Sequence, residues 1–146
     1  MKKLNLILYY LLSFTWGIIM NIIGLFAFTG ALIVGGKPMI FHGRFVVKVG
    51  SCWGGVSLGN FILTDQDWEW VIKHETGHTI QNAWMGPFFL FLVGIPSVIR
   101  YWYRELKYYR YNVYPPTEYD SVWFESSSTL LGNKYVDRRE KQTARK

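Results

Sequence analysis

The first 36 residues restrict the fold more strongly than any other part of the chain, because the run from Leu4 to Gly36 contains no charged residue. A helix that crosses a bilayer needs about 20 apolar residues, so these 33 positions are long enough for one tilted crossing and too short for two. The apolar part of a cleaved signal peptide is only about 7–15 residues long. We therefore expect a retained transmembrane helix that anchors the chain through residues 1–36.

A second apolar segment lies in the middle of the chain, at residues 83–99. The pair Gly86-Pro87 interrupts it and leaves 12 uninterrupted residues, a length more typical of a re-entrant or buried segment than of a crossing. Taken whole, its 17 residues are just enough to cross, so both interpretations stay open. Residues 100–114 follow with many Tyr and Trp side chains and regularly spaced basic residues, a pattern typical of the lipid headgroup level.

Composition supports a membrane protein and excludes several other classes. Half of the residues are hydrophobic and 18% are charged, whereas about a quarter are charged in a typical soluble domain. This hydrophobicity excludes a disordered chain, and the single cysteine, Cys52, excludes a disulfide scaffold. A net charge of +6 suits nucleic acid as well as an anionic membrane. The apolar segment beside the basic residues has no role in a soluble nucleic-acid binder, so we expect an integral protein of a bacterial inner (plasma) membrane and no nucleic-acid partner.

Sequence patterns outside the apolar segments predict helices and one short β element. Residues 39–64 are rich in β-branched and aromatic residues with glycine between the runs, which is typical of strands. A helix is expected to begin at Thr64, where Asp67 completes a capping pair. A C-terminal helix is expected from about Thr117 to a stop at Gly132.

The sequence His74-Glu75-Thr76-Gly77-His78 lies inside the first of these helices. Residues four apart lie on one face of a helix, so His74 and His78 can present two imidazoles to one Zn²⁺. Glu75 lies beside the first histidine, where it can remove a proton from a zinc-bound water and act as general base. Gly77 has no side chain, which lets another element pack close to the site. The alternative is two ordinary helical histidines and a surface glutamate.

A zinc peptidase needs a third protein ligand and one position left open for water. Glu125 is the leading candidate, because it lies in an apolar stretch of the C-terminal helix, where a carboxylate needs a partner. The alternative is a glutamate on the solvated side of an amphipathic helix. Asp120 is the second choice, although capping of the first helical turn is favoured for it. The remaining candidates, which have weaker arguments, are His42, Glu105, Glu118 and Asp137.

The motif HETGH, a glutamate on a later helix and the adjoining membrane segments resemble the gluzincin branch of zinc metallopeptidases. The closest in style are integral-membrane enzymes of the CAAX-prenyl-protease and heat-shock membrane-protease type. The resemblance implies a membrane-anchored hydrolase of peptide bonds with Zn²⁺ as cofactor, in which His74, His78 and Glu125 bind the metal and Glu75 is the base. Thr129 stands four residues after Glu125, where gluzincins commonly carry Asp.

The predicted fold class is a mainly α membrane protein. It has one N-terminal transmembrane helix, a short β element, an HExxH helix, a second apolar segment that is re-entrant or spanning, and a C-terminal helix. Its parts are a transmembrane anchor (1–36), a zincin-like catalytic region that includes the apolar segment (37–135), and a frayed basic tail (136–146). The rival hypothesis is a non-enzymatic small membrane protein that acts through a partner, with HETGH fortuitous or a structural metal site.

The second apolar segment determines whether the predicted ligands can meet. If residues 83–99 cross the membrane, His78 and Glu125 lie about 30 Å apart and cannot share a metal ion. A single crossing with the remainder of the chain in the cytoplasm keeps them together and places every basic residue except Lys2 and Lys3 inside. We therefore expect the site on the cytoplasmic side.

The expected partners are the lipid bilayer and a substrate that is a peptide or a membrane protein. Zinc peptidases commonly bind an extended substrate along an exposed strand edge, which Trp53, Phe61 and Ile62 would line. The alternative is that these residues pack on the HETGH helix. An oxyanion would be stabilised by His42 or by a tyrosine such as Tyr119, and the spacing selects neither.

Overall fold

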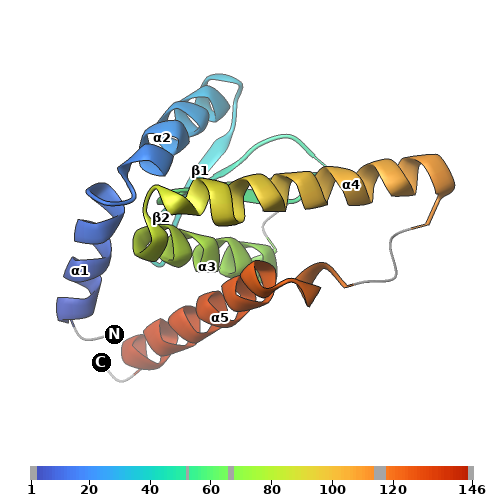
Figure 1. Cartoon of the computed structure of the whole chain (residues 1–146). Helices are drawn as coiled ribbons and strands as arrows, with labels where there is room; N and C mark the ends of the chain where they lie inside the picture. Colours follow the sequence, from blue (N-terminus) through green and yellow to red (C-terminus); the bar gives the residue numbers. More distant parts are fainter. Residues whose placement is uncertain (1–2, 52, 66–67, 114–117, 145–146) are drawn as a thin grey trace.

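The structure, a computed structural model, describes residues 3–51, 53–65, 68–113 and 118–144. Cys52, Asp67 and Thr117, which entered the sequence predictions, lie outside these ranges. In the described part helices predominate and four short strands form one mixed sheet, in agreement with the predicted mainly helical fold with a β element. The elements follow in the order α1 (Lys3–Phe14), α2 (Ile18–Ile33), β1 (Lys37–Phe41), β2 (Arg44–Lys48), β3 (Gly55–Leu58), β4 (Phe61–Thr64), α3 (Glu69–Met85), a π-helical turn (Leu90–Gly94), α4 (Ile95–Tyr111), a 3₁₀ turn (Tyr119–Ser121) and α5 (Trp123–Thr143) (Figure 1).

The sheet has the strand order β1-β2-β4-β3 and carries a helix on each face. β1 and β2 form an antiparallel hairpin, β2 and β4 pair in parallel, and β3 is antiparallel to β4. Successive residues of β4 point to opposite faces. The ring of Phe61 lies 5.4 Å from that of Phe28 in α2, whereas Ile62 packs with Val46 and with Ile72 of α3. The sheet therefore holds α2 on one side and α3 on the other.

This packing corrects the predicted substrate edge. Phe61 and Ile62 belong to β4, which is paired on both sides, by β2 and by β3, so it has no free edge. Trp53 lies in the loop before β3, where its Nε1 donates a hydrogen bond of 2.8 Å to the carbonyl oxygen of Val49. The alternative of packing on the HETGH helix is confirmed for Ile62, whereas Phe61 packs on the opposite face of the sheet, against α2. The strand at the sheet edge beside α3 is β3.

The predicted single N-terminal helix is wrong, because the chain breaks at residues 15–17 into α1 and α2. The side-chain amide of Asn21 donates hydrogen bonds of 2.6 and 3.1 Å to the carbonyl oxygens of Ser13 and Gly17, which links the end of α1 to the start of α2 across the break. Gly17 has no room for a side chain, since a Cβ there would lie 2.7 Å from Nδ2 of Asn82 in α3. Among the described residues no single helix is long and apolar enough to cross a membrane; α1 and α2 meet that test only as a pair bent by 83°.

The second apolar segment turns back instead of continuing as one helix. α3 ends before Gly86, which adopts a φ of 58° that L-residues rarely take, and the π-helical turn then leads into α4. Figure 1 shows α4 running back across α3. Nε2 of His78 in α3 lies 3.2 Å from Oε2 of Glu125 in α5, so the full crossing that would have separated the two residues is wrong.

Two predicted helix boundaries are also wrong. α3 begins at Glu69, because Thr64 is the last residue of β4. α5 continues past Gly132 to Thr143, so this glycine is no stop and the tail is helical up to that residue. Tyr135 and Val136 explain the continuation, since their buried side chains pack the turn of α5 after Gly132 against the rest of the fold.

Candidate metal centre

Two glycines let α3 and α5 approach to backbone contact. A Cβ at Gly77 would overlap the carbonyl oxygen of Ser128, and a Cβ at Gly132 would overlap the carbonyl oxygen of Lys73. The hydroxyl of Ser128 donates a hydrogen bond of 2.6 Å to the carbonyl oxygen of His74 across this contact. The prediction that Gly77 admits a neighbouring element is confirmed, and the neighbour is α5.

The side chains of His74, His78 and Glu125 meet between these two helices. Nε2 of His74 and Nε2 of His78 lie 3.1 and 3.2 Å from the same carboxylate oxygen, Oε2 of Glu125. Glu125 is fully buried, and the hydroxyl of Ser97 in α4 donates a hydrogen bond of 2.6 Å to its other oxygen, Oε1. The three ligands predicted from the sequence are therefore brought together, in a group that could hold a metal ion.

The hydrogen bond at Nδ1 of His74, the ring nitrogen that faces away from Glu125, fixes the position of the ring proton. This nitrogen lies 2.8 Å from the hydroxyl oxygen of Thr129, and that hydroxyl donates its single hydrogen to Oδ2 of Asp120, also at 2.8 Å. The oxygen of Thr129 must therefore accept a hydrogen bond from Nδ1–H of His74. In the neutral ring this leaves a lone pair on Nε2, the nitrogen that faces Glu125.

His78 is oriented in the same way by Gln81. Its Nδ1 lies 2.7 Å from Oε1 of Gln81, which can only accept a hydrogen bond. The Gln81 amide group is fixed in this orientation, because its nitrogen donates to the carbonyl oxygen of Phe124 and to the hydroxyl of Ser127, at 2.8 and 2.7 Å. The proton of His78 therefore also lies on Nδ1, and its Nε2 lone pair faces Glu125.

Two imidazole lone pairs and a carboxylate oxygen that face one another repel unless a positive charge lies between them. In the metal-free protein a proton supplies this charge: although burial lowers it, the hydrogen bond with Glu125 raises the pKa of His74 above its ordinary value. Burial would raise the pKa of Glu125, but hydrogen bonds that His74 and His78 donate when their rings are protonated hold it well below its usual range. The site is therefore built to attract a cation, which is either a proton or a metal ion.

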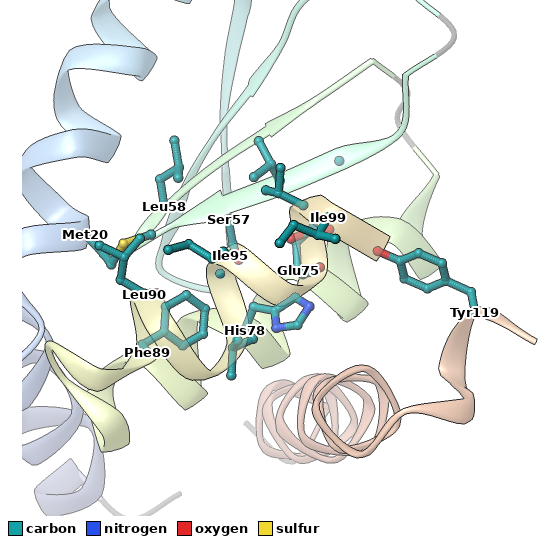
Figure 2. Close-up of a pocket in the computed structure, with 16 residues that line it drawn as sticks. Met20, Ser57, Leu58, Glu75, His78, Phe89, Leu90, Ile95, Ile99 and Tyr119 are labelled. Atoms are coloured by element: carbon teal, nitrogen blue, oxygen red, sulfur yellow. The ribbon is translucent and has the colours of Figure 1, made fainter. Parts of the chain in front are cut away.

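A cavity of about 250 Å³ reaches the candidate ligand group at His78 (Figure 2). Glu75 and His78 of α3 line it, and the hydroxyl of Tyr119 points toward it. The side chain of Glu75 is buried, and it makes no hydrogen bond with any residue in the part of the chain that the structure describes. A buried carboxylate without a protein partner needs one from outside the protein, such as a water molecule in the cavity.

Tyr119 is held at the cavity by Arg100 of α4. Nη2 of Arg100 donates hydrogen bonds of 2.7 and 3.2 Å to the carbonyl oxygens of Glu118 and Tyr119, which fixes the 3₁₀ turn. Burial, and after it the negative charge of Glu125, raises the pKa of Tyr119 above its ordinary value. The phenol therefore keeps its proton and can donate a hydrogen bond into the cavity.

The other candidate ligands lie outside this group. His42 occupies the turn between β1 and β2, where its carbonyl oxygen accepts hydrogen bonds from Arg44 and Tyr135, so it is a structural residue and does not line the cavity. Asp120 accepts a hydrogen bond from Thr129, the residue that orients His74, and it does not join the ligand group among the described residues. Within the described part of the chain, the remaining three candidates do not join the group: Glu105 in α4, Glu118 beside the 3₁₀ turn and Asp137 in α5.

Three residues that contact the ligands were not predicted: Gln81, Ser97 and Thr129. Gln81 had a usable signal, because a residue three positions after His78 lies on the same side of the helix. Thr129 also had one, since it occupies the position at which gluzincins commonly carry Asp. Ser97 had none, because its contact depends on the turn that returns α4 to α5.

No protein-family model, no curated protein and no solved structure matches the chain. The interpretation of the site therefore rests on its geometry. That geometry consists of three convergent donor atoms, two oriented imidazoles, and a cavity with a buried carboxylate beside them.

Proposed function

We propose that the chain is a membrane-associated, zinc-dependent peptidase of the gluzincin type. The observation that carries the proposal is the arrangement of three acceptor atoms, Nε2 of His74, Nε2 of His78 and Oε2 of Glu125, around a space that needs a positive charge. Two imidazoles and one carboxylate, with a fourth position left to water, form a donor set of catalytic zinc sites. The cavity and the unpartnered carboxylate of Glu75 support a catalytic site over a closed structural one.

The distances from the two imidazole nitrogens to the carboxylate oxygen suit zinc. Zn²⁺ binds imidazole nitrogen and carboxylate oxygen at about 2.0–2.2 Å, so two ligands of a tetrahedral site lie about 3.3 Å apart. The nitrogen-to-oxygen distances of 3.1 and 3.2 Å need only a small adjustment to match this value. Mg²⁺ and Ca²⁺ prefer oxygen ligands, which makes them poor matches for a site with two imidazoles.

Each polar residue at the cavity has a separate role in the proposed hydrolysis. Bound zinc would polarise the peptide carbonyl and acidify the attacking water. Glu75 accepts the proton of this water, and Tyr119 donates a hydrogen bond to the carbonyl oxygen as negative charge develops on it. Ser97 holds the carboxylate of Glu125 by its second oxygen, which keeps the first directed at the histidines.

The direct test is the zinc content of the purified full chain, measured by elemental analysis. The wild type is expected to hold about one zinc ion per chain, and His78→Ala and Glu125→Gln are expected to hold almost none. His42→Ala is the matched control, because it removes the one histidine outside the group and should keep the metal. A folded wild-type protein without zinc contradicts the proposal, and loss in His78→Ala alone removes Glu125 from the ligand set.

The hydrogen bond from His74 to Thr129 leads to a second prediction. Thr129→Val keeps the shape of the side chain but removes the acceptor that fixes the ring, so the zinc affinity is expected to fall about 10- to 100-fold. Competition with a chromogenic chelator measures this change. Thr143→Val, at the exposed end of the same helix, is the control, and an unchanged affinity in Thr129→Val would show that the ring needs no such support.

The membrane part of the proposal rests on apolar side chains that the fold leaves exposed. Phe26 and Ile33 of α2 are 74% and 82% exposed, and Ile99 and Trp102 of α4 are 62% and 58% exposed. α4 has no buried residue, and its C-terminal half projects beyond the remainder of the fold (Figure 1). Clustered exposed apolar side chains are typical of surfaces that bind a membrane or a partner protein, so these helices are the ones that lipid would cover.

Membrane fractionation tests this association. The protein is expected to sediment with membranes, to remain there through a high-salt wash and to leave only in detergent, because apolar contacts are not screened by salt. Release by salt alone would mean that the basic residues, rather than the apolar faces, hold the protein to its partner.

A further inference from the structure

The cavity beside the candidate metal centre has a polar end and an apolar end (Figure 2). The polar end contains the functional groups described above. The apolar end is formed by Met20 of α2, Leu58 of β3, and Phe89, Leu90 and Val93 of the turn between α3 and α4. Met20, Phe89 and Val93 also belong to one buried hydrophobic cluster, so this wall is part of the core.

We propose that the apolar end binds a bulky apolar side chain of the substrate, of the size of Phe or Leu, next to the bond that is cleaved. The inference rests on the proposed peptidase function and adds the substrate class to it. The peptidase would therefore cleave beside large apolar residues and would discriminate against small and charged ones.

The size of the cavity supports a side chain of this kind. A cavity of about 150 Å³ is already large enough to bind benzene. The 250 Å³ found here can hold one such ring together with the backbone atoms that must approach Glu75. A small side chain would leave part of this space empty and would lose the dispersion contacts with its walls.

The chemistry of the lining excludes a charged side chain. Among the described residues that line the cavity, Glu75 and Tyr119 lie away from the apolar end (Figure 2). The ionisable group beside the apolar end is His78, whose ring centroid lies 6.2 Å from that of Phe89, and this imidazole is one of the proposed zinc ligands. A charged side chain placed there would lose its hydration without gaining a partner, which is strongly unfavourable.

The strand beside the cavity indicates that the ligand is a polypeptide rather than a hydrocarbon chain. All four residues of β3, Gly55–Leu58, line the cavity. Side chains alternate along a strand, so four consecutive residues can line one cavity only if the strand presents its edge to it. β3 is the last strand of the sheet, and its outer edge offers backbone groups that an extended peptide can pair with and a hydrocarbon chain cannot.

The test uses two peptide hydroxamates that carry the same metal-binding group and differ only in one side chain, benzyl or methyl. Their binding to the zinc-loaded full chain is measured by titration calorimetry. The benzyl compound is expected to bind about 10- to 100-fold more tightly, because it alone fills the apolar end. Equal affinities would overturn the inference and leave the metal centre supported, whereas binding of neither compound would overturn the peptidase function together with it.

A pair of variants locates the effect in the cavity. Leu90→Trp places a ring in the apolar end and is expected to bring the two affinities within about threefold of each other. Leu92→Trp is the matched control, because this residue lies on the same turn, is exposed and does not line the cavity. A benzyl preference that survives in Leu90→Trp would overturn the inference.

Discussion

Glu75→Gln is expected to reduce peptide hydrolysis by about 10²- to 10⁴-fold while the zinc content stays that of the wild type. The amide has nearly the size of the carboxylate, so the packing of this side chain against Gly55 of β3 is preserved. It cannot accept a proton from the attacking water, which removes the general base. The zinc content should not change, because Glu75 is not among the three convergent donor residues. The measurement is kcat/KM on a peptide with an apolar residue at the cleaved bond, together with elemental analysis of the same sample.

The matched control for this variant is Glu69→Gln on the same helix. Glu69 is exposed and pairs with Lys73 at 2.6 Å, so its loss should leave hydrolysis unchanged. Wild-type activity in Glu75→Gln would contradict the role of Glu75. A wild-type protein that holds zinc but cleaves no peptide, and whose function survives Glu75→Gln, would favour the rival hypothesis of a structural metal site in a protein that acts through a partner.

Gly77→Ala is expected to lower the free energy of unfolding by about 3 kcal/mol and to weaken zinc binding in the same variant. The added methyl group would overlap the carbonyl oxygen of Ser128, and backbone cannot move aside as a flexible side chain can. α3 and α5 must then separate, which moves Glu125 away from the two histidines. Chemical denaturation and zinc titration of the detergent-purified protein measure the two effects.

Gly30→Ala provides the control for the substitution itself. Gly30 lies in α2, and a Cβ at this position meets no atom within 4 Å. Alanine has the higher helix propensity, so this variant should be as stable as the wild type or more stable by up to about 1 kcal/mol. A Gly77→Ala protein that unfolds like the wild type would show that the helices are not in backbone contact at this point.

Three predictions made from the residues of one element agree with the structure. The spacing of His74 and His78 required only that the segment be helical, and their Nε2 atoms do face one carboxylate oxygen. The prediction of Glu125 rested on the cost of a carboxylate in an apolar stretch, and this residue is indeed fully buried with three partners. The glycine-punctuated run at 39–64 forms strands for the same local reason.

Two of the predictions that failed depended on residues distant in the sequence. The apolar run at the N-terminus has the length of a crossing helix, yet it breaks at Gly17, whose carbonyl oxygen accepts a hydrogen bond from Asn82, 65 residues away. Gly132 was predicted to end the helix, because glycine is common at helix C-termini. In the structure it lies inside α5, against the carbonyl oxygen of Lys73, and no local pattern reveals this contact. Hydropathy and propensity measure one segment at a time, and neither contains such a contact.

The sequence by itself determined two imidazoles on one helical face with a carboxylate beside them, since helical periodicity converts spacing into direction. Only the tertiary structure decided that Glu125 completes this group and that Thr129, Gln81 and Ser97 orient it. It alone also placed the edge of β3 along the cavity. These contacts join four elements, and their geometry depends on how the helices pack, which no spacing within one element specifies.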